Sequence, residues 1–336
     1  MHIFVTGGTG FFGKALLRHW ASGAAPELAG ARFTLLSRDP QRFALAHGDL
    51  LAGLDVRFHQ GDIQRPETLP ADGAFTHIMH AATDSTLGLG LTPLARHDQI
   101  VEGTRHVLEL ARRIGVRRML LTSSGGVYGT PPAGIDAIPE SWNGMPDPLD
   151  PQNAYSVAKR EAEHLCALYH DAYGIDTVIA RCFAFVGEDL PLDAHFAIGN
   201  FLRDALDGKD ITVNGDGTPI RSYMDQRDLA HWLGVLLLRG QAQRAYNVGS
   251  DRAISIADLA HAIARRGEPA PLAVRIQRQP VTGQSARRNC YLPDIARARA
   301  ELGLEIEVDL DEAIAHTLAR HRALRNESRS GAVSGA

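Results

Sequence analysis

A short apolar segment that runs directly into a glycine-rich turn restricts the fold of this 336-residue chain more than any other feature. Residues 3–5 are Ile-Phe-Val, and the next eight residues are Thr-Gly-Gly-Thr-Gly-Phe-Phe-Gly, with a G-x-x-G-x-x-G spacing. A glycine-rich turn between a strand and a helix lets the backbone approach a diphosphate, which the positive N-terminal end of the helix attracts. A plain tight turn is the alternative. We predict that the turn binds a dinucleotide cofactor through Gly7, Gly10, Phe11, Phe12 and Gly13.

Similar apolar segments recur along the chain and alternate with amphipathic stretches. They cover residues 33–37, 56–59, 77–81, 119–123, 178–183 and 245–249. Continuous apolar runs of this length are typical of strands buried on both faces of a sheet. Residues 99–114 and 153–173 repeat apolar side chains at helical spacing. The alternation predicts an α/β protein with a Rossmann doubly wound parallel sheet.

The pattern of strands and helices changes near residue 187, where prolines and glycines begin to separate shorter elements. We predict an NAD(P)-binding Rossmann domain over residues 1–186, with a return segment at about 225–255. Residues 187–224 and 256–325 are predicted to form a smaller mixed α/β C-terminal lobe, to which the family resemblance described below assigns binding of the substrate. Small polar residues dominate 326–336, and we expect them to be a disordered tail.

Composition excludes several classes of protein. The net charge is −4, so the basic excess typical of nucleic-acid-binding proteins is missing. No apolar run approaches the roughly 20 residues of a membrane span. The cysteines Cys166, Cys182 and Cys290 form no C-x-x-C pair, and no His-Glu-x-x-His occurs, so we expect neither a disulfide framework nor a metal site. With no signal peptide in view, we expect a cytoplasmic protein.

Residues at the ends of the second and third predicted strands bear on the choice of cofactor. An acidic residue at the second strand end would bind the adenosine ribose of NAD, but this chain has Ser37 and Arg38 there. A hydroxyl and a guanidinium suit a 2′-phosphate, which favours NADP over NAD. Asp62, followed by Ile63, is positioned to contact the adenine. The alternatives are a surface arginine at 38 and an ordinary turn aspartate at 62.

The strongest chemical signal is a tyrosine and a lysine four residues apart on one predicted helix. Tyr155 and Lys159 share a helix face, and Ser124 ends a predicted strand upstream. A phenol with a pKa of about 10 is a poor base at neutral pH, but a nearby ammonium favours its ionised form. The chain has 35 Lys and Arg residues but only three lysines, so Lys159 is retained where arginine is the rule. We predict Ser124, Tyr155 and Lys159 to be catalytic.

Together these motifs resemble the extended short-chain dehydrogenase/reductase family, in its nucleotide-sugar epimerase/dehydratase branch, over about residues 1–320. The matching residues include the glycine-rich turn, Asp62, residues 80–82, Ser124, Tyr155/Lys159 and residues 247–249. The resemblance implies NAD or NADP as cofactor, a nucleotide-diphosphate sugar as substrate, and a homodimer formed through two helices of each subunit. It adds Ala81 and Ala82 to the cofactor site. For the substrate it implies Thr83, Ser85, Ser124, Gly125, Gly126, Asn200, Arg221 and Arg288.

The chain departs from the family pattern at three places. The 4,6-dehydratases of the family carry an Asp-Glu pair after the active serine or threonine, and the decarboxylases keep the Glu. This chain has Gly125 and Gly126 there, and neither can transfer a proton. An asparagine of the family is replaced by Ile100, which puts its water network in doubt. Another is replaced by Ala184, which removes an expected substrate contact.

These observations favour a 4-epimerase that acts on a nucleotide-diphosphate sugar through a transient 4-keto intermediate. A reductase of a keto-sugar nucleotide would use the same three catalytic residues. A 4,6-dehydratase would need acids from elsewhere in the chain. A cofactor-sensing protein without catalysis is the alternative of another class, and the retained Tyr155 and Lys159 argue against it.

Overall fold

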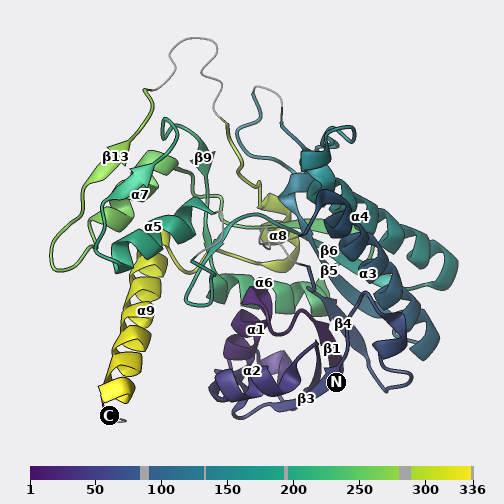
Figure 1. Ribbon diagram of the computed structural model, residues 1–336. Helices are drawn as coiled ribbons and strands as arrows, with labels where there is room; N and C mark the ends of the chain where they lie inside the picture. The colour runs from purple at the N-terminus through teal and green to yellow at the C-terminus, as the bar shows by residue number, and fades with distance from the viewer. Residues whose placement is uncertain (84–90, 132–133, 193–195, 280–288, 334–336) are drawn as a thin grey trace.

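In the computed structural model, a seven-stranded parallel sheet forms the centre of the larger part of the molecule (Figure 1). The structure describes residues 1–83, 91–131, 134–192, 196–279 and 289–333. The strand order is β11-β6-β5-β4-β1-β2-β3. The strands are β1 (His2–Thr6), β2 (Arg32–Ser37), β3 (Asp55–Gln60), β4 (His77–His80), β5 (Arg118–Ser124), β6 (Asp176–Cys182) and β11 (Arg244–Val248). Each corresponds to a predicted apolar segment, and the predicted Rossmann fold class is confirmed.

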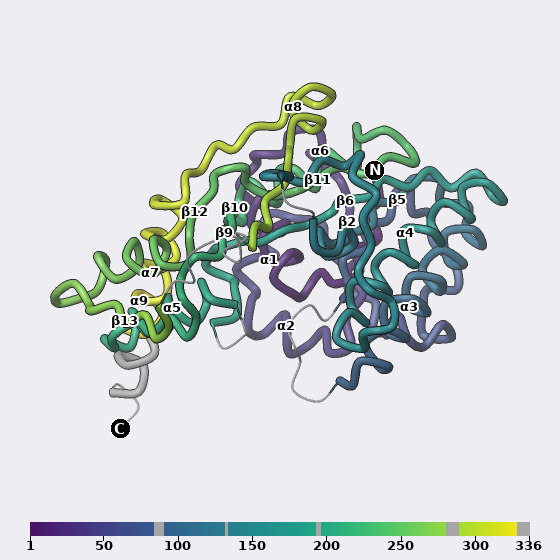
Figure 2. Tube along the Cα trace, turned by 90° about the horizontal axis from the view of Figure 1, so that it is seen from above, coloured from purple at the N-terminus to yellow at the C-terminus, as the bar shows by residue number. Residues whose placement is uncertain are grey.

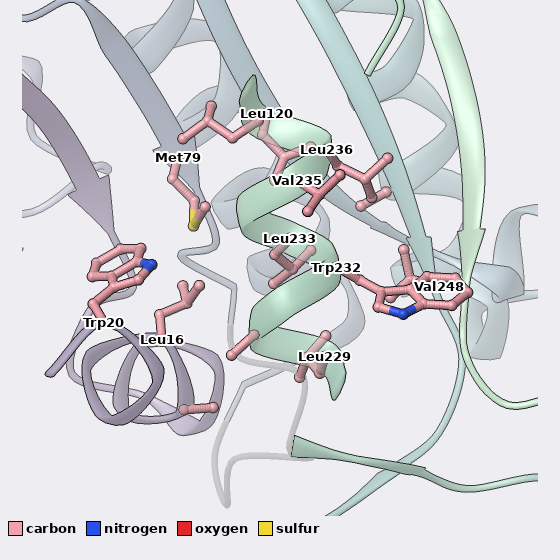
Figure 3. Close-up of a cluster of buried hydrophobic side chains, with 14 of the residues drawn as sticks. Leu16, Trp20, Met79, Leu120, Leu229, Trp232, Leu233, Val235, Leu236 and Val248 are labelled. Atoms are coloured by element: carbon pink, nitrogen blue, oxygen red, sulfur yellow. The ribbon is translucent and has the colours of Figure 1, made fainter. Parts of the chain in front are cut away.

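Helices cover both faces of the sheet because side chains alternate between its faces along each strand. Ile3 and Val5 of β1 face one buried cluster, and Phe4 faces another. The first cluster contains apolar residues of α1 (Phe11–Ala21), α2 (Pro40–Ala46) and α6 (Gln226–Arg239). The second contains those of α3 (Pro93–Ile114) and α4 (Ala154–Tyr173). Figure 3 shows Leu229, Trp232, Leu233 and Leu236 of α6 packed between α1, with Leu16 and Trp20, and the strands that carry Met79, Leu120 and Val248.

A smaller lobe lies beside the sheet domain (Figures 1 and 2) and has a buried cluster of its own. Its helices are α5 (Ala197–Leu206), α7 (Ile256–Ala264) and α9 (Leu310–Val333). Short strand pairs complete it, with β8 (Ile211–Val213) parallel to β13 (Val274–Ile276) and β9 (Ile220–Arg221) antiparallel to β12 (Ile254–Ser255). Strands β7 (Phe185–Val186) and β10 (Met224–Asp225) pair where the chain passes between the two parts.

The segment around α8 (Ala296–Leu302) differs from the predicted domain boundaries. We expected residues 256–325 to belong to the substrate lobe. Instead Ile295, Ala298 and Leu302 pack in the same cluster as α6 and β11, and Arg297 Nη1 donates a hydrogen bond to Ala245 O at 2.7 Å. The segment thereby covers β11, an edge strand of the sheet, which would otherwise be exposed.

The C-terminal residues also differ from the prediction. The expected disordered tail began at residue 326, but α9 continues to Val333. Arg325 ties this helix to the C-terminal end of α5, with hydrogen bonds to Leu206 O at 2.7 Å and to Asp207 Oδ1 at 3.0 Å. Composition alone could not reveal this contact, which involves residues distant in the sequence. In the described part of the chain, no helix is long and apolar enough to cross a membrane.

Candidate active site

The predicted cofactor and catalytic residues gather at the carboxyl ends of the parallel strands. The glycine-rich turn follows β1, Ala81 to Thr83 follow β4, and Ser124 ends β5. The N-terminal turns of α4 bring Tyr155 and Lys159 to the same edge, where open α/β sheets bind their ligands. The loops of several strands therefore build one site.

The glycines of the turn after β1 are required by close backbone approaches. Gly7 has a φ of 75°, and a Cβ there would lie 2.5 Å from the carbonyl of Ala81. A Cβ on Gly13 would lie 2.2 Å from the carbonyl carbon of Gly8. Gly10 has more room, because the nearest atom to its Cβ would be Gly7 O at 3.5 Å. The backbone of the turn is thus too closely packed for side chains at Gly7 and Gly13, whereas Gly10 has space for a Cβ.

The N-terminus of α1 suits a diphosphate. Gly10 is the residue before the helix, no side chain caps the first turn, and no acidic residue lies in it. Its first N–H groups and the positive end of the helix dipole therefore remain for an anion. The rings of Phe11 and Phe12 pack near Phe185, with centroid distances of 6.5 and 5.3 Å, so these two residues offer the ligand their backbone. These features fit a dinucleotide cofactor.

Two residues at the end of β2 face different surroundings. Ser37 is buried, and its Oγ accepts a hydrogen bond from Asp39 N at 3.2 Å. Arg38 is exposed, and in the described part of the chain its guanidinium forms no hydrogen bond or ion pair. After β3, Asp62 accepts a hydrogen bond from Gln64 N at 3.0 Å, while the side chain of Ile63 packs in the core. Arg38 is therefore available for a phosphate. Asp62 also stabilises its own turn through the hydrogen bond from Gln64, which was the alternative to a contact with the adenine.

A chain of hydrogen bonds joins β1, β4 and α3 behind the site. Thr104 Oγ1 donates to Ile100 O at 2.7 Å and so accepts from His80 Nε2 at 3.2 Å. The other ring nitrogen of His80 then accepts from Thr6 Oγ1 at 2.7 Å. Burial lowers the pKa of His80 to about 3, so its ring is neutral at physiological pH. This chain holds residues 80–82 against the glycine-rich turn, since Ala82 N donates to Thr6 Oγ1 at 3.3 Å.

Ser124 and Tyr155 lie together, as predicted. A hydrogen bond from Ser124 favours the ionised form of Tyr155, but burial outweighs it and raises the pKa of Tyr155 to about 12. The sequence predicted a lowered pKa because an ammonium would lie beside the phenol. Lys159 Nζ does lie 5.9 Å from the centre of the Tyr155 ring, but its hydrogen bonds go elsewhere. Loss of hydration therefore dominates the pKa of this phenol.

Lys159 is anchored by two oxygen atoms. Its Nζ donates to Thr122 O and to Thr83 Oγ1, both at 2.7 Å. Burial lowers the pKa of Lys159 to about 8, against the charge of Glu163, which acts to raise it. An ammonium has three N–H donors, so one remains for a ligand. Thr83, predicted to bind the substrate, thus contacts the lysine predicted to be catalytic.

Gly125 and Gly126 begin the 3₁₀ turn after β5 and are closely surrounded. A Cβ on Gly125 would lie 2.5 Å from the hydroxyl of Tyr291 and 2.8 Å from Phe183. A Cβ on Gly126 would lie 2.5 Å from Ser156 Oγ. Neither position has room for an acidic side chain while these neighbours keep their places. Tyr291 therefore occupies the space beside Ser124 that a side chain at residue 125 would need.

The predicted substrate residues of the lobe are spread over several elements. Asn200 lies in α5, half-buried. Arg221 ends β9, and its Nη1 donates to Ile220 O at 2.7 Å and to Asn289 O at 2.8 Å. Its guanidinium lies 6.0 Å from the centre of the Tyr291 ring, which connects it to the active site. Ser85 and Arg288 lie outside the described residues.

Sequence reasoning missed two residues near Tyr155. Tyr291 follows a predicted diphosphate arginine but was assigned no role, although the hydroxyl of Ser124 is within hydrogen-bonding reach of both tyrosines. Burial raises the pKa of Tyr291 above the usual range. Arg96, on α3, is buried and acts to lower the pKa of Tyr155. A basic residue amid the apolar repeat of α3 was the only available signal.

Among the described residues, no three His, Cys, Asp or Glu side chains group as a metal site.

A Rossmann sheet, a glycine-rich turn at a helix N-terminus and a Ser-Tyr-Lys set define an enzyme class that uses a nicotinamide cofactor. The comparison with known families agrees with this class. The model of the NAD dependent epimerase/dehydratase family matches residues 3–249, and the chain belongs to this family. The resemblance inferred from the sequence and the prediction of an enzyme are thus confirmed.

Relatives across the whole chain are nucleotide-sugar enzymes by name. UDP-glucuronic acid decarboxylase 5 of Arabidopsis thaliana is 29% identical over 317 residues, which cover 94% of this chain and 87% of that protein. A dTDP-glucose 4,6-dehydratase of an Actinoplanes species is 29% identical over 349 residues, covering 97% and 99%. The dTDP-glucose 4,6-dehydratase of Streptomyces venezuelae, solved with NAD bound, superposes with a TM-score of 0.79 at 26% identity, covering 97% and 98%.

Proposed function

We propose that this protein is a 4-epimerase of a nucleotide-diphosphate sugar that works through a transient 4-keto intermediate. The observation that carries the proposal is the packing around Gly125 and Gly126. Tyr291, Phe183 and Ser156 fill the space that acidic side chains at these positions would need. A dehydratase or decarboxylase that places its acids in this loop would require a different arrangement. The chain shares its family with such enzymes, but this loop argues against their chemistry here.

Ser124, Tyr155 and Lys159 supply the groups that an epimerase requires. Tyr155 must first be ionised, against the effect of its burial, and the positive charge of an oxidised nicotinamide would favour that form. The phenolate then accepts the proton of the C4 hydroxyl and later returns it, and Ser124 donates a hydrogen bond to the developing oxyanion. Lys159 has two of its donors bound to Thr83 and Thr122, and its third donor would bind the ribose of the cofactor. The bound nicotinamide supplies hydride acceptance and return. The two glycines leave the neighbouring sugar without a charged side chain as it turns over.

The cofactor is NAD or NADP, and we propose a preference for NADP. Arg38 is exposed at the end of β2, without an ion pair in the described part of the chain, so its guanidinium is available to a 2′-phosphate. The glycine-rich turn, Ala81 and Ala82 would hold the rest of the dinucleotide, with Ser37, Asp62 and Ile63 near its adenosine. Arg221 and Asn200 are proposed to bind the nucleotide sugar from the lobe.

We also propose that the protein is a homodimer. Helices α3 and α4 lie side by side on one face of the sheet (Figure 2). Their apolar residues largely pack in the core, but Leu168 of α4 remains 50% exposed, which supports an interface on the outer side of these two helices.

The mass of the product distinguishes the candidate reactions. Purified protein is incubated with a panel of nucleotide sugars, with and without added NAD or NADP, and the products are weighed by mass spectrometry. We expect a product of unchanged mass and no net oxidation or reduction of the cofactor. Loss of water would indicate a dehydratase, and loss of carbon dioxide a decarboxylase. A gain of two hydrogens with cofactor oxidation would indicate a reductase.

Tyr155→Phe tests whether this site performs the reaction. Loss of one positioned acid–base group should lower turnover about 100-fold or more, with cofactor binding nearly intact. Tyr173→Phe on the same helix is the matched control, because Tyr173 is 49% exposed and far along α4. A Tyr155→Phe variant that keeps more than about a tenth of the wild-type rate would contradict the assignment.

A further inference from the structure

A buried arginine in the first turns of α3 has no partner among the residues that the structure describes. The Arg96 side chain is only 7% exposed, and in the described part of the chain its guanidinium forms no hydrogen bond or ion pair. Arg181, by comparison, donates to Glu163 at 2.7 Å. Burying a charge without a partner is costly, so a protein that does so commonly meets the charge with a ligand.

The geometry of α3 places Arg96 at the edge of the sheet where the catalytic residues lie. Thr104, a little over two turns later and buried like Arg96, is 3.2 Å from the ring of His80 at the carboxyl end of β4. The helix connects parallel strands and so runs opposite to them, which places Arg96 about 12 Å beyond Thr104 in the direction of the strand ends.

Electrostatics connect the same guanidinium to the catalytic phenol. Burial raises the pKa of Tyr155, and the charge of Arg96 is one of the effects that oppose this rise. The loop after Ser124 carries no charge, because its first residues are Gly125 and Gly126. Glu163, on the same helix as Tyr155, is bound by Arg181 and Ser123. The described side chains around Tyr155 therefore leave the charge of Arg96 without a counterion.

We propose that Arg96 binds a carboxylate on the sugar, so that the substrate is a nucleotide-diphosphate uronate. This inference rests on the proposed nucleotide-sugar function. The phosphates of the cofactor and of the substrate already have separate candidates, the turn at α1 and Arg221 of the lobe. The remaining place for an anion is next to Tyr155. In a uronate the carboxylate carbon is attached to C5, beside the C4 on which Tyr155 acts.

The chemistry of the residue agrees with this ligand. A guanidinium binds a carboxylate through two parallel N–H···O bonds and fixes its orientation. Gly125 and Gly126 add no negative charge beside such a carboxylate. One relative of this chain, UDP-glucuronic acid decarboxylase 5, is named for a uronate substrate.

Paired ligands that differ only at C6 test the proposal. Isothermal titration in the presence of the cofactor compares UDP-glucuronate with UDP-glucose, and GDP-mannuronate with GDP-mannose, so that the preference is measured within one base. We expect at least one uronate to bind about tenfold or more tightly than its neutral partner. Arg96→Met should abolish this preference while it leaves binding of the neutral sugar nearly unchanged, and Arg96→Lys should restore part of it.

Controls separate this role from structural and cofactor roles. Arg105→Met changes an exposed arginine of the same helix and should keep the preference. Arg96→Met should melt no lower than the wild type, because it removes a buried charge that has no partner among the described residues. The proposal is overturned if no uronate binds more tightly than its neutral partner, or if Arg96→Met weakens cofactor binding and both ligands alike. If the protein prefers the uronate but the product differs in mass from the substrate, the epimerase proposal is refuted and the uronate proposal stands. If the mass is unchanged but the protein shows no preference for the uronate, the uronate proposal is refuted and the epimerase proposal stands.

Discussion

At the scale of single residues, the surroundings of each arginine determine whether its guanidinium stabilises the fold or can bind a ligand. Arg181 is paired with Glu163, Arg221 donates to backbone carbonyls, and Arg96 is buried without a partner in the described part of the chain. Arg38 is exposed at a strand end. A guanidinium group thus stabilises the fold at some positions of this chain and is available to a ligand at others. Composition shows that arginine replaced lysine, but not which arginine has which role.

Arg38→Ala tests the choice between the two cofactors. If Arg38 binds the 2′-phosphate, the wild type should prefer NADP and the variant should lose that preference. A charge-assisted hydrogen bond of this kind contributes roughly 1.5–3 kcal/mol, or about 10- to 150-fold in affinity. Fluorescence titration with both cofactors measures it. Arg42→Ala, an exposed arginine on α2, is the control that should change neither affinity. Equal wild-type affinities would make Arg38 a surface residue only.

At the scale of elements, the glycines of the turn between β1 and α1 have different roles, either in folding or in binding the ligand. A side chain at residue 13 would collide with the backbone of Gly8, and one at residue 7 would meet Ala81. A Cβ at residue 10 would make only an ordinary contact with Gly7 O at 3.5 Å, just before the first turn of the helix. The motif therefore combines positions needed for folding with a position needed for the ligand, although the sequence pattern treats them alike.

Gly13→Ala and Gly10→Ala should separate these tasks. Gly13→Ala forces a Cβ to within 2.2 Å of a backbone carbon, so we expect the free energy of unfolding to fall by about 1–3 kcal/mol or more. Gly10→Ala should lower it by about 1 kcal/mol at most, as an alanine before a helix does. It should nevertheless weaken cofactor binding by about tenfold or more, since its methyl group obstructs the diphosphate. Urea unfolding and cofactor titration measure the two effects, and equal behaviour of the variants would contradict the division.

At the scale of the whole molecule, the sheet domain and the lobe each have their own hydrophobic core, and both contribute residues to the candidate site. The sheet domain supplies the glycine-rich turn and the predicted catalytic residues, and the lobe contributes β9 with Arg221. Tyr291 connects them, because its N donates to Ile220 O at 3.1 Å while its hydroxyl reaches Ser124. Correct placement of the lobe is therefore a condition for the arrangement around Ser124.

The proposed dimer predicts a molecular mass twice the 36.4 kDa of the chain. Leu168→Arg, which places a charge on the outer side of α4, should shift the protein to monomers without unfolding it. Leu45→Arg is the control, because Leu45 is 89% exposed on α2, outside the proposed interface. Analytical ultracentrifugation measures both variants. A monomeric wild type, or a Leu168→Arg variant that remains dimeric, would exclude the α3–α4 interface.

The sequence alone determined the strands of the main sheet and the residues proposed for the candidate site. Apolar runs, glycine spacing and the Tyr155–Lys159 pair are local patterns, because strand burial, turn geometry and helix periodicity act over a few residues. They identified the seven strands of the main sheet, and they predicted three side chains of the candidate site that the structure brings to one edge of that sheet.

Only the tertiary structure decided which distant residues complete the site and the core. Tyr291 fills the space beside Gly125, Thr83 accepts a hydrogen bond from Lys159, and Arg96 lies buried near Tyr155. Segment 295–302 covers the sheet edge rather than joining the lobe. These placements depend on contacts between residues far apart in the chain. Local pattern carries no information about such contacts, because they arise when whole elements pack to bury apolar surface and exclude water.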